Sequence, residues 1–159
     1  MRSPTQVAAL CAAIVIALSV VSGASAAVFS RASESKIIRA MNQIRVARGL
    51  RPLRYSDKLR AAARAHSRDM MRRGYFAHGS MGRRVSRFGV HAPVVGENLA
   101  WGTGSYGTAK VIVQEWLVSP EHRANLLRPG FRWVGVGSAV GRFVGRRGAT
   151  VVTADFAGR

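Results

Sequence analysis

The stretch Trp116-Leu117-Val118-Ser119-Pro120-Glu121-His122-Arg123 joins two helical patterns and sets the fold of the second half of the chain. Up to this junction, the apolar residues of Thr108 to Val118 recur at a spacing that predicts a helix. Ser119 is a preferred N-cap and Pro120 a preferred first helical residue, so a short second helix begins here. His122 falls in its first turn, where free N–H groups disfavour a protonated imidazole. We therefore expect His122 to be neutral.

Two earlier segments carry the same scarce residue types. They are Tyr75-Phe76-Ala77-His78 and Gly96-Glu97-Asn98-Leu99-Ala100, in a chain with only seven Asp plus Glu and four His. Surface composition therefore does not explain a histidine or an acid beside special backbone residues. The three segments together indicate one shared site. We expect His78 to be anchored by the aromatic residues before it, and Glu97 to sit in a turn of a long functional loop.

Two helices are predicted before that loop. One covers Glu34 to Arg48 and ends at Gly49, and the other covers Asp57 to Arg73 with His66 on its apolar side. The second helix carries an arginine ladder on its opposite side, which we interpret as a solvated face in preference to an anion-binding stripe. The ladder consists of Arg60, Arg64, Arg68 and Arg72.

Period-two patterns follow from Trp133 onward. Val134 and Val136 alternate with Gly135 and Gly137, and a strand with one nearly bare face lets another backbone approach closely. The alternation returns in Thr150 to Phe156, with Gly145-Arg146-Arg147-Gly148 as the predicted hairpin turn. The fold class is therefore α+β, with an antiparallel sheet covered by helices.

The first 26 residues read as a signal peptide. Arg2 precedes an apolar run that is short for a membrane span, and the small residues that end at Ala26 fit a cleavage site. Residues 27–159 are then a single domain that does not span a membrane once processed. Cys11, the only cysteine, lies in the removed segment, so disulfides, thiol catalysis and thiolate metal sites are excluded from the exported protein. We expect a secreted or periplasmic protein.

The charge is strongly positive. Lys plus Arg number 25 against seven acids, a formal net charge of +18, and removing Arg2 with the signal peptide leaves +17. An exported protein with this balance is attracted to anionic envelope components or lipid headgroups. Because the protein is exported, no nucleic-acid partner is expected.

The order of motifs resembles the bacterial branch of the CAP superfamily, which includes cysteine-rich secretory, venom antigen and plant pathogenesis-related proteins. This resemblance implies an α-β-α sandwich, with a small antiparallel sheet between helical layers and a cleft on one side. The motifs that carry it are Asn42-x-x-Arg45, Gly49-Leu50-x-Pro52-Leu53, Ala65-His66-Ser67-x-x-Met70, Tyr75-Phe76-x-His78, Gly96-Glu97-Asn98, Trp116-x-x-Ser119-Pro120-x-His122-Arg123-x-Asn125 and Val134-Gly135-Val136-Gly137.

The resemblance also implies a site. In that family two histidines and two glutamates line the cleft and in some members bind a divalent cation, here Zn²⁺, Ca²⁺ or Mg²⁺. By motif, His78, Glu97 and His122 match three of the four. Fuller members carry a glutamate where this chain has Ser119, and Glu121 is the candidate that could enter the cleft instead.

Simpler interpretations stand beside these assignments. Glu97 could be a carboxylate that accepts backbone N–H bonds and holds a loop, and one group can also do both. His66 is expected to pack on its helix with a satisfied hydrogen bond, and His91 to belong to a mobile loop. Gly102 to Gly107 fits the glycine fingerprint of dinucleotide folds, but no parallel strand-loop-helix unit surrounds it. We interpret it as the rim of the cleft.

Three functions remain open. The first is a secreted binding protein whose cleft takes a lipid, sterol-like or envelope-derived ligand, with or without a metal. The second is a metal-dependent hydrolase of peptide, nucleic acid or cell-wall material with Glu121 as base, since no serine elbow or His-Glu-x-x-His motif occurs in the sequence. The third is a cationic envelope-interacting or antimicrobial protein. The sequence favours a non-enzymatic role.

Overall fold

The computed structural model describes residues 30–159, and the predicted signal peptide lies outside them. The helices are α1 (Arg31–Val46), α2 (Asp57–Arg73), α3 (Met81–Arg87), α4 (Ala109–Val118) and α5 (Pro120–Leu127), with a 3₁₀ helix η1 (Gly104–Gly107) before α4. The strands are β1 (Arg54–Tyr55), β2 (Val94–Thr103), β3 (Phe131–Phe143) and β4 (Arg146–Gly158).

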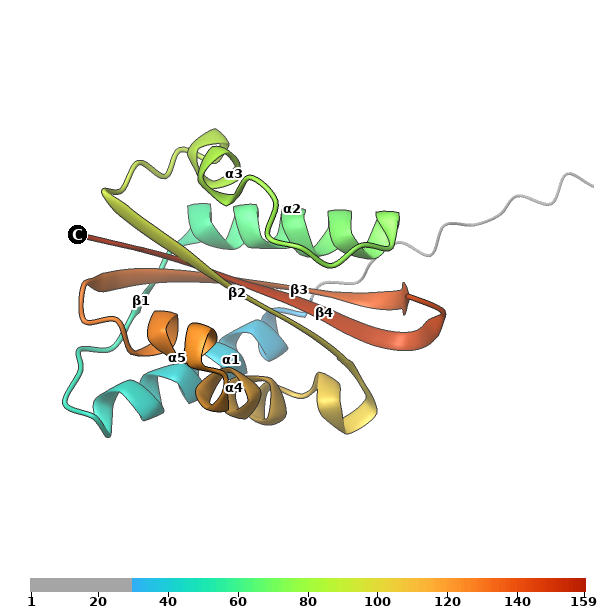
Figure 1. Cartoon of the computed structure of the whole chain (residues 1–159), viewed down its shortest axis with the longest axis horizontal. Coiled ribbons are helices and arrows are strands. Elements are labelled where there is room, and N and C mark those ends of the chain that lie inside the picture. Colours follow the sequence, from blue (N-terminus) through green and yellow to red (C-terminus); the bar gives the residue numbers. More distant parts are fainter. Residues whose placement is uncertain (1–29) are drawn as a thin grey trace, which may run out of the picture.

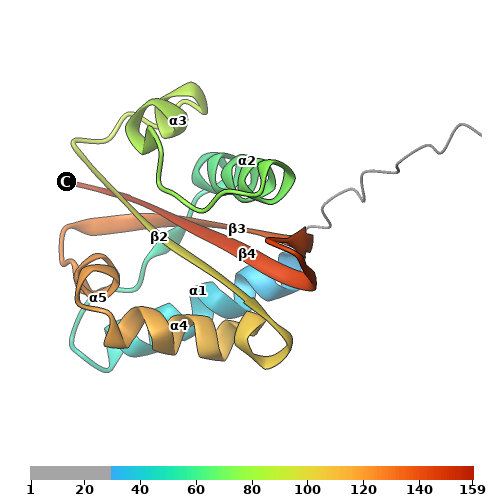
Figure 2. The same ribbon diagram turned by 45° about the vertical axis from the view of Figure 1, so that its right-hand side comes forward.

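The sheet lies between two helical layers, as expected for an α-β-α sandwich (Figure 1). Its strand order is β1-β3-β4-β2, so β2 is an edge strand. Helices α2 and α3 cover one face, and α1, α4 and α5 cover the other, which Figure 2 shows from a second direction. The three long strands are antiparallel, while the two-residue β1 pairs with β3 in parallel.

The glycines of β3 bring α2 onto the sheet. A Cβ at Gly135 would collide with the backbone of Leu59 and Arg60, and one at Gly137 with that of Ala63 and Arg64. The predicted close approach of a backbone to the bare face is therefore confirmed, and the backbone is that of α2.

A hydroxyl on α2 fastens the same contact. Ser67 Oγ donates to Gly137 O at 2.9 Å and lies 2.9 Å from Thr153 Oγ1, so it ties α2 to both β3 and β4. Because these groups are buried, the hydrogen bonds also satisfy polar atoms that water cannot reach.

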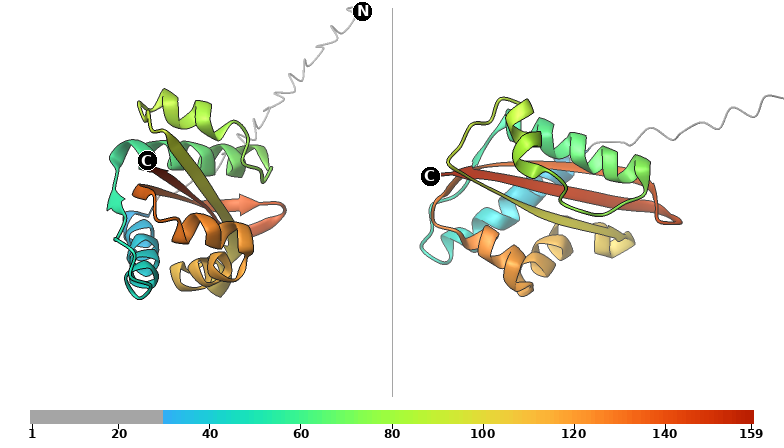
Figure 3. Two further views of the ribbon diagram at one scale, coloured as in Figure 1. Left: turned by 60° about the vertical axis from the view of Figure 1, so that its left-hand side comes forward. Right: turned by 45° about the horizontal axis from the view of Figure 1, so that its top comes forward.

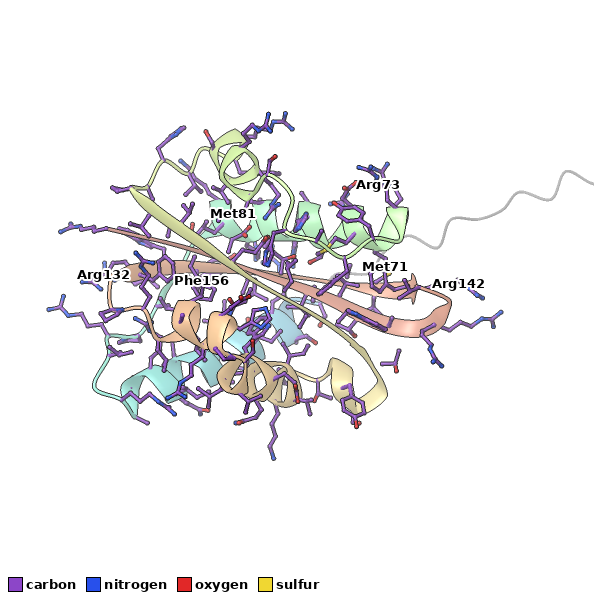
Figure 4. All side chains as sticks on the ribbon, in the orientation of Figure 1. Met71, Arg73, Met81, Arg132, Arg142 and Phe156 are labelled. Carbon is purple, nitrogen blue, oxygen red and sulfur yellow. The ribbon has the colours of Figure 1, made fainter. Side chains whose placement is uncertain are left out.

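The opposite face of the sheet carries the larger core. Phe131 and Phe156 stack with their ring centroids 5.2 Å apart, and Trp116 of α4 is buried in the same cluster. Figure 4 labels Phe156 in this region, whereas Arg142 extends outward from the hairpin end of the sheet. Fully burying one such apolar side chain contributes about 1.5–3 kcal/mol. This core fixes α4 and α5, whose junction carries His122.

Two local predictions need correction. The hairpin turns at Val144 and Gly145, both at positive φ, and Arg146 to Gly148 already belong to β4. A two-residue turn with two positive φ angles matches the right-handed twist of its strands, so it displaces the longer turn that the glycines suggested. The supposed long loop after α2 is also wrong, because it contains both α3 and β2. Figure 3 shows β2 crossing the sheet diagonally beside β4.

The arginine ladder of α2 is a solvated face only in part, because the side chains of Arg60 and Arg64 are 18% and 20% exposed while that of Arg72 is 72% exposed. Arg64 donates through Nε and Nη2 to both oxygens of buried Glu34, at 2.8 and 2.7 Å. Arg60 pairs with Asp57 and Arg72 with Asp69. The Arg64–Glu34 pair links α2 to α1, whereas the other two pairs lie within α2.

None of the helices within residues 30–159 has the length and apolar character needed to cross a bilayer.

Candidate functional site

Glu97 lies in the middle of the edge strand β2, not in a turn as the sequence predicted. Strand alternation turns its side chain toward α2, and only 1% of that side chain is exposed. The turn was predicted because glycine and asparagine flank Glu97. In the fold, Gly96 is needed because a Cβ there would collide with the ring of Phe131.

Four side chains, those of His66, His78, Arg84 and Asp155, surround the Glu97 carboxylate. His78 Nδ1 lies 2.7 Å from Oε1, while Arg84 Nη2 of α3 donates to Oε2. The same Arg84 nitrogen lies 3.4 Å from Asp155 Oδ1, and Asp155 is the residue opposite Glu97 in the antiparallel register. The alternative in which Glu97 holds a loop through backbone N–H groups is therefore wrong, since its partners are side chains.

Two buried carboxyl groups beside one guanidinium hold a proton between them. Burial raises the pKa of Glu97 to about 7, although Arg84 and a hydrogen bond from Asp155 favour its ionised form. Burial and the neighbouring Glu97 charge raise the pKa of Asp155 well above its usual range. Asp155 Oδ2 has no hydrogen-bond partner within residues 30–159, and an unpaired buried oxygen costs less on a neutral carboxyl group than on a carboxylate.

His66 belongs to the same cluster. Its Nε2 donates to Ala77 O at 3.0 Å and lies 3.8 Å from Glu97 Oε2. The expected satisfied hydrogen bond is confirmed, and it fixes a neutral tautomer with the proton on Nε2. Burial, followed by the nearby Arg84 charge, lowers the pKa of His66 to about 4. The ring thus positions the Ala77-His78 segment without carrying a charge at neutral pH.

His122 lies in the first turn of α5, as predicted. Burial lowers its pKa, and the nearby His78 lowers it further while Glu121 raises it. The expected neutral ring is thus favoured, and burial and a second histidine contribute to it. Ser119 occupies the N-cap position and Pro120 the first turn, but the Ser119 side chain makes no capping hydrogen bond.

The side chains of two asparagines hold α5 against the edge of β2. Asn98 Nδ2 donates to His122 O at 2.9 Å, and Asn125 Nδ2 donates to Glu97 O and Asn98 Oδ1 at 3.0 Å each. Trp116 Nε1 adds a hydrogen bond to Leu99 O at 2.9 Å. The Gly-Glu-Asn motif thus sends Glu97 to one face of the sheet and Asn98 to the other.

A cavity of about 440 Å³ lies beside β2 on the α4 and α5 side. Its lining is mostly apolar and aromatic, and His122, Ser119 and Glu115 contribute its polar side chains. The residues are Phe76, Leu99, Ala100, Trp101, Tyr106, Val111, Ile112, Glu115, Trp116, Ser119 and His122. Tyr106 comes from η1, so the glycine-rich segment does form a rim of the cavity.

The remaining sequence candidates lie outside this cavity lining. Glu121 is exposed in the first turn of α5, and His91 is exposed in the segment between α3 and β2. Glu115 of α4, which the sequence did not single out, is the carboxylate that reaches the cavity.

The predicted metal ligands do not form a ready coordination site. Within residues 30–159 no three His, Asp or Glu side chains are grouped so that they could hold a metal ion. The reason is visible at Glu97, whose two oxygens face His78 and the positive Arg84. A cationic guanidinium on the carboxylate opposes a second cation there. The divalent cation therefore stays a prediction, and no chemistry below depends on it.

Comparison with known proteins places this geometry in a family. The family model described as "CAP: Cysteine-rich secretory protein family" matches residues 38–156, which is most of the chain and includes every residue of the site. This chain belongs to the CAP family. Within the CAP domain, the Gly-Glu-Asn strand and the Ser-Pro-Glu-His helix start are the elements that meet at the cavity.

Similarities to individual proteins support this family assignment. Bacillus subtilis YkwD is 37% identical over 111 residues, which are 67% of this chain but 42% of the relative. An extracellular protein with an SCP domain from Bacillus anthracis superposes with a TM-score of 0.69 at 28% identity, over 80% of this chain and 41% of that one. This CAP chain therefore spans less than half the length of both relatives.

A more distant relative has nearly the same extent. An outer surface protein of Borrelia burgdorferi superposes with a TM-score of 0.71 over 84% of this chain and 97% of that one. At 17% identity it supports the CAP fold alone.

Arg84 and Asp155 are the site residues that sequence reasoning missed. Arg84 lies on α3, a helix of seven residues with Val85 as its one buried residue, so no periodic pattern indicates it. Asp155 did leave a signal. It is one of only seven acids in the chain, and it sits in the alternating run Thr150 to Phe156, where a buried carboxyl needs a partner.

Proposed function

We propose that this CAP-domain protein is exported and binds an amphipathic ligand, a lipid or a sterol-like or envelope-derived molecule, in the cavity beside β2. The observation that carries the proposal is the lining of that cavity, which is apolar and aromatic along its length and polar around His122. Its volume of about 440 Å³ lies within the ~300–1,000 Å³ typical of small-molecule sites.

The aromatic residues suit an apolar ligand body. Phe76, Trp101 and Tyr106 are 44%, 40% and 69% exposed, although large apolar side chains are ordinarily covered. All three line the same cavity from separate segments, the loop after α2, strand β2 and η1. Covering this aromatic surface with an acyl chain or a ring system would contribute about 25 cal/mol per Å².

The polar side chains suit a hydroxyl or carboxyl head. A neutral His122 ring offers one donor and one acceptor, and the Ser119 hydroxyl lies on the same cavity wall. Neutrality matters because a charged ring would have to be desolvated when an apolar ligand covers it. Binding in this form needs no metal.

Binding is tested with cis-parinaric acid, a fluorescent fatty acid, and dehydroergosterol, a fluorescent sterol, on the purified protein. Val111 of α4 lines the cavity, so Val111→Trp fills it and should weaken binding of the accepted probe at least tenfold. His122→Ala should weaken binding severalfold through the loss of the head-group contact.

Val118→Trp is the matched control, because Val118 lies on the same helix but is 73% exposed and outside the cavity lining. It should bind like the wild type. Equal affinities of Val111→Trp and Val118→Trp for both probes would overturn the cavity as the binding site, and so would the absence of binding by the wild type.

Export rests on residues 1–26, whose pattern predicts a signal peptide, and on the similarity to a protein described as extracellular. N-terminal sequencing of the protein from culture supernatant and cell fractions tests it, with Ala27 expected as the first residue. A mature chain that begins at Met1 would contradict it.

The metal-dependent hydrolase stays the alternative. It requires a ligand set that the described side chains do not form, because Arg84 occupies the Glu97 carboxylate. The cationic envelope-interaction hypothesis rests on the net charge of +17 that remains after removal of Arg2 from the full chain's +18, and binding to anionic vesicles that is insensitive to salt would contradict it.

A further inference from the structure

A second cavity, of about 400 Å³, lies on the other side of the sheet between α2 and α3. Figure 2 shows α3 lying over α2, joined to it by the loop that contains His78. The lining combines one wall of arginines with a few small and aromatic residues. It consists of Ala65, His66, Asp69, Tyr75, Gly79, Ser80, Arg83, Arg84, Arg87 and Phe88.

The cavity is positively charged. Three arginines, Arg83, Arg84 and Arg87, come from the single short helix α3, and Asp69 is the one acid in the lining. Asp69 is already neutralised from outside the cavity, because Arg72 Nη2 donates to it at 2.9 Å. Tyr75 Oη donates to the same carboxylate at 2.7 Å. Arg84 is paired with Glu97 and Asp155 behind the cavity, whereas Arg83 and Arg87 form no ion pair within residues 30–159.

Arg84 has an unused donor. Its Nη2 donates to Glu97 and Asp155 and its Nη1 to His78 O at 3.1 Å, but Nε is buried and has no hydrogen-bond partner within residues 30–159. An unpaired buried donor costs about 1–3 kcal/mol, so it needs an explanation. The guanidinium side chain is only 12% exposed, which limits the water that could satisfy it.

Arg87 and Ser80 complete the donor set. No hydrogen bond or ion pair within the described part of the chain engages the Arg87 guanidinium, and Arg83 Nη2 donates only to Ser80 Oγ, at 3.0 Å. Arg83, Arg84 and Arg87 can thus supply several N–H groups to one small anion. A tetrahedral phosphate matches this arrangement, since arginine forks bind its oxygens in pairs.

We propose that the α2–α3 cavity binds the phosphate group of a phosphate ester. Arg84 Nε and the Arg87 guanidinium hold the phosphate oxygens, and Phe88 and Tyr75 contact the organic part. The cavity is separate from the one beside β2, so this site does not depend on the amphipathic ligand. The ester is either a soluble molecule or a phospholipid headgroup, which present the same chemistry to the arginines.

The test uses sn-glycerol 3-phosphate as the soluble probe and phosphatidic acid vesicles as the membrane probe, with phosphatidylcholine vesicles for comparison. The ¹H–¹⁵N resonance of Arg84 Nε should shift on addition of either accepted probe. Arg87→Gln should weaken binding about tenfold or more, because it removes an exposed side chain that lines the cavity.

Arg39→Gln is the matched control. Arg39 is exposed on α1, in the opposite helical layer, so the substitution removes the same charge away from the cavity. Arg87-dependent binding of the glycerol phosphate identifies a soluble ester, and Arg87-dependent binding of the phosphatidic acid vesicles alone identifies a headgroup.

Three outcomes overturn the site. The first is an Arg84 Nε resonance that does not move with either probe. The second is an equal loss of binding in Arg39→Gln and Arg87→Gln, which would reduce the effect to overall charge. The third is equal binding of both kinds of vesicle without binding of the soluble ester. Both variants change exposed positions, so the fold survives the comparison.

Discussion

Glu97 on β2 and Asp155 on β4 are directly opposite each other in the antiparallel ladder, and Arg84 contacts both carboxyl groups from α3. Two like charges at this separation are costly in a buried site, and one guanidinium neutralises only one of them. The pair therefore retains a proton near neutral pH. Glu97 in turn orients His78. The protonation state of the Glu97–Asp155 pair therefore affects the loop that carries His78, at the edge of the cavity beside β2.

The first prediction concerns stability between about pH 4.5 and 7. The pKa of Glu97 is about 7 in the folded protein against an ordinary 4.5, so the folded state keeps a proton that the unfolded chain releases. This contribution to the free energy of unfolding is full below pH 4.5 and is lost as the pH rises to 7. At ~1.4 kcal/mol per pH unit the loss is ~3 kcal/mol. Urea unfolding between about pH 4.5 and 8 measures it.

Glu97→Gln removes this loss, and it also relieves the charge that raises the pKa of Asp155. The unfolding free energy of Glu97→Gln should therefore rise relative to that of the wild type as the pH increases. His66, His78, Arg84 and Asp155 face Glu97 and are unchanged in the variant. A pH-independent difference would contradict the shared proton. Glu115→Gln, at an exposed carboxylate, should follow the wild-type profile.

The second prediction concerns acid. Burial holds the pKa of His66 at about 4, below its ordinary 6.5. Between these pH values the unfolded chain binds a proton at His66 and the folded protein does not. This contribution is full above pH 6.5 and is lost as the pH falls to 4, by up to ~3 kcal/mol. It opposes the Glu97 effect where the two windows overlap, so each is isolated with its own variant.

His66→Gln keeps a donor for Ala77 O and cannot be protonated. Its unfolding free energy should decline less than that of the wild type between pH 6.5 and 4, measured by urea unfolding. His91→Gln is the control, because His91 is exposed. If His66→Gln and the wild type lost stability in parallel, His66 would not be the group that resists protonation.

Periodicity in the sequence was sufficient to predict the position of the helices and strands that have strong apolar patterns. The predicted bounds of α2 agree with the structure at both ends, and the Ser119-Pro120 junction starts α5 where expected. The Gly135 and Gly137 face was interpreted correctly because only a close backbone neighbour explains two glycines in one strand face. Helix ends and bare strand faces depend on residues that are near one another in the chain, so they can be predicted from the sequence.

The cluster around Glu97 could not be predicted in the same way. Glu97, Asp155 and Arg84 are 13 to 71 residues apart in the chain, and only strand register and the packing of α3 bring them together. The Gly96-Glu97-Asn98 segment looked like a turn because both flanking residues favour turns. In the structure Gly96 makes room for Phe131, and Asn98 binds the His122 carbonyl. Tertiary contacts thus overrode the local preference.

The third prediction tests the approach of α2 to the sheet. Gly135→Ala places a methyl group against the backbone of Leu59 and Arg60, which cannot move without displacing the helix. We expect a loss of about 1–3 kcal/mol or more in unfolding free energy. Gly82→Ala is the matched control, because a Cβ there meets nothing within 4 Å and lies in α3.

In an unobstructed helix, alanine is favoured over glycine by up to ~1 kcal/mol, so Gly82→Ala should be neutral or stabilising. Gly135→Ala should therefore lower the unfolding midpoint, whereas Gly82→Ala should leave it unchanged or raise it. Equal midpoints would show that α2 does not rest on the bare face of β3.

The fourth prediction concerns Asn98, which connects the edge strand to His122. Its Nδ2 donates to His122 O, while its Oδ1 accepts from Asn125 Nδ2, and the residue is fully buried. Asn98→Asp keeps the shape but replaces the donor with an oxygen that repels the His122 carbonyl. The loss should be about 1–3 kcal/mol or more, measured by urea unfolding.

The titration of the His122 ring distinguishes a general loss of stability from a positioning role of Asn98. The new carboxylate adds negative charge near His122, so the pKa of that ring should rise from its lowered value, as followed by its imidazole NMR resonances. Asn42→Asp is the control, because Asn42 Nδ2 also donates to a backbone carbonyl, that of Leu53, at 3.0 Å. It should destabilise the fold yet leave the His122 titration unchanged. If both variants shift His122 equally, Asn98 acts on overall stability and does not position the ring.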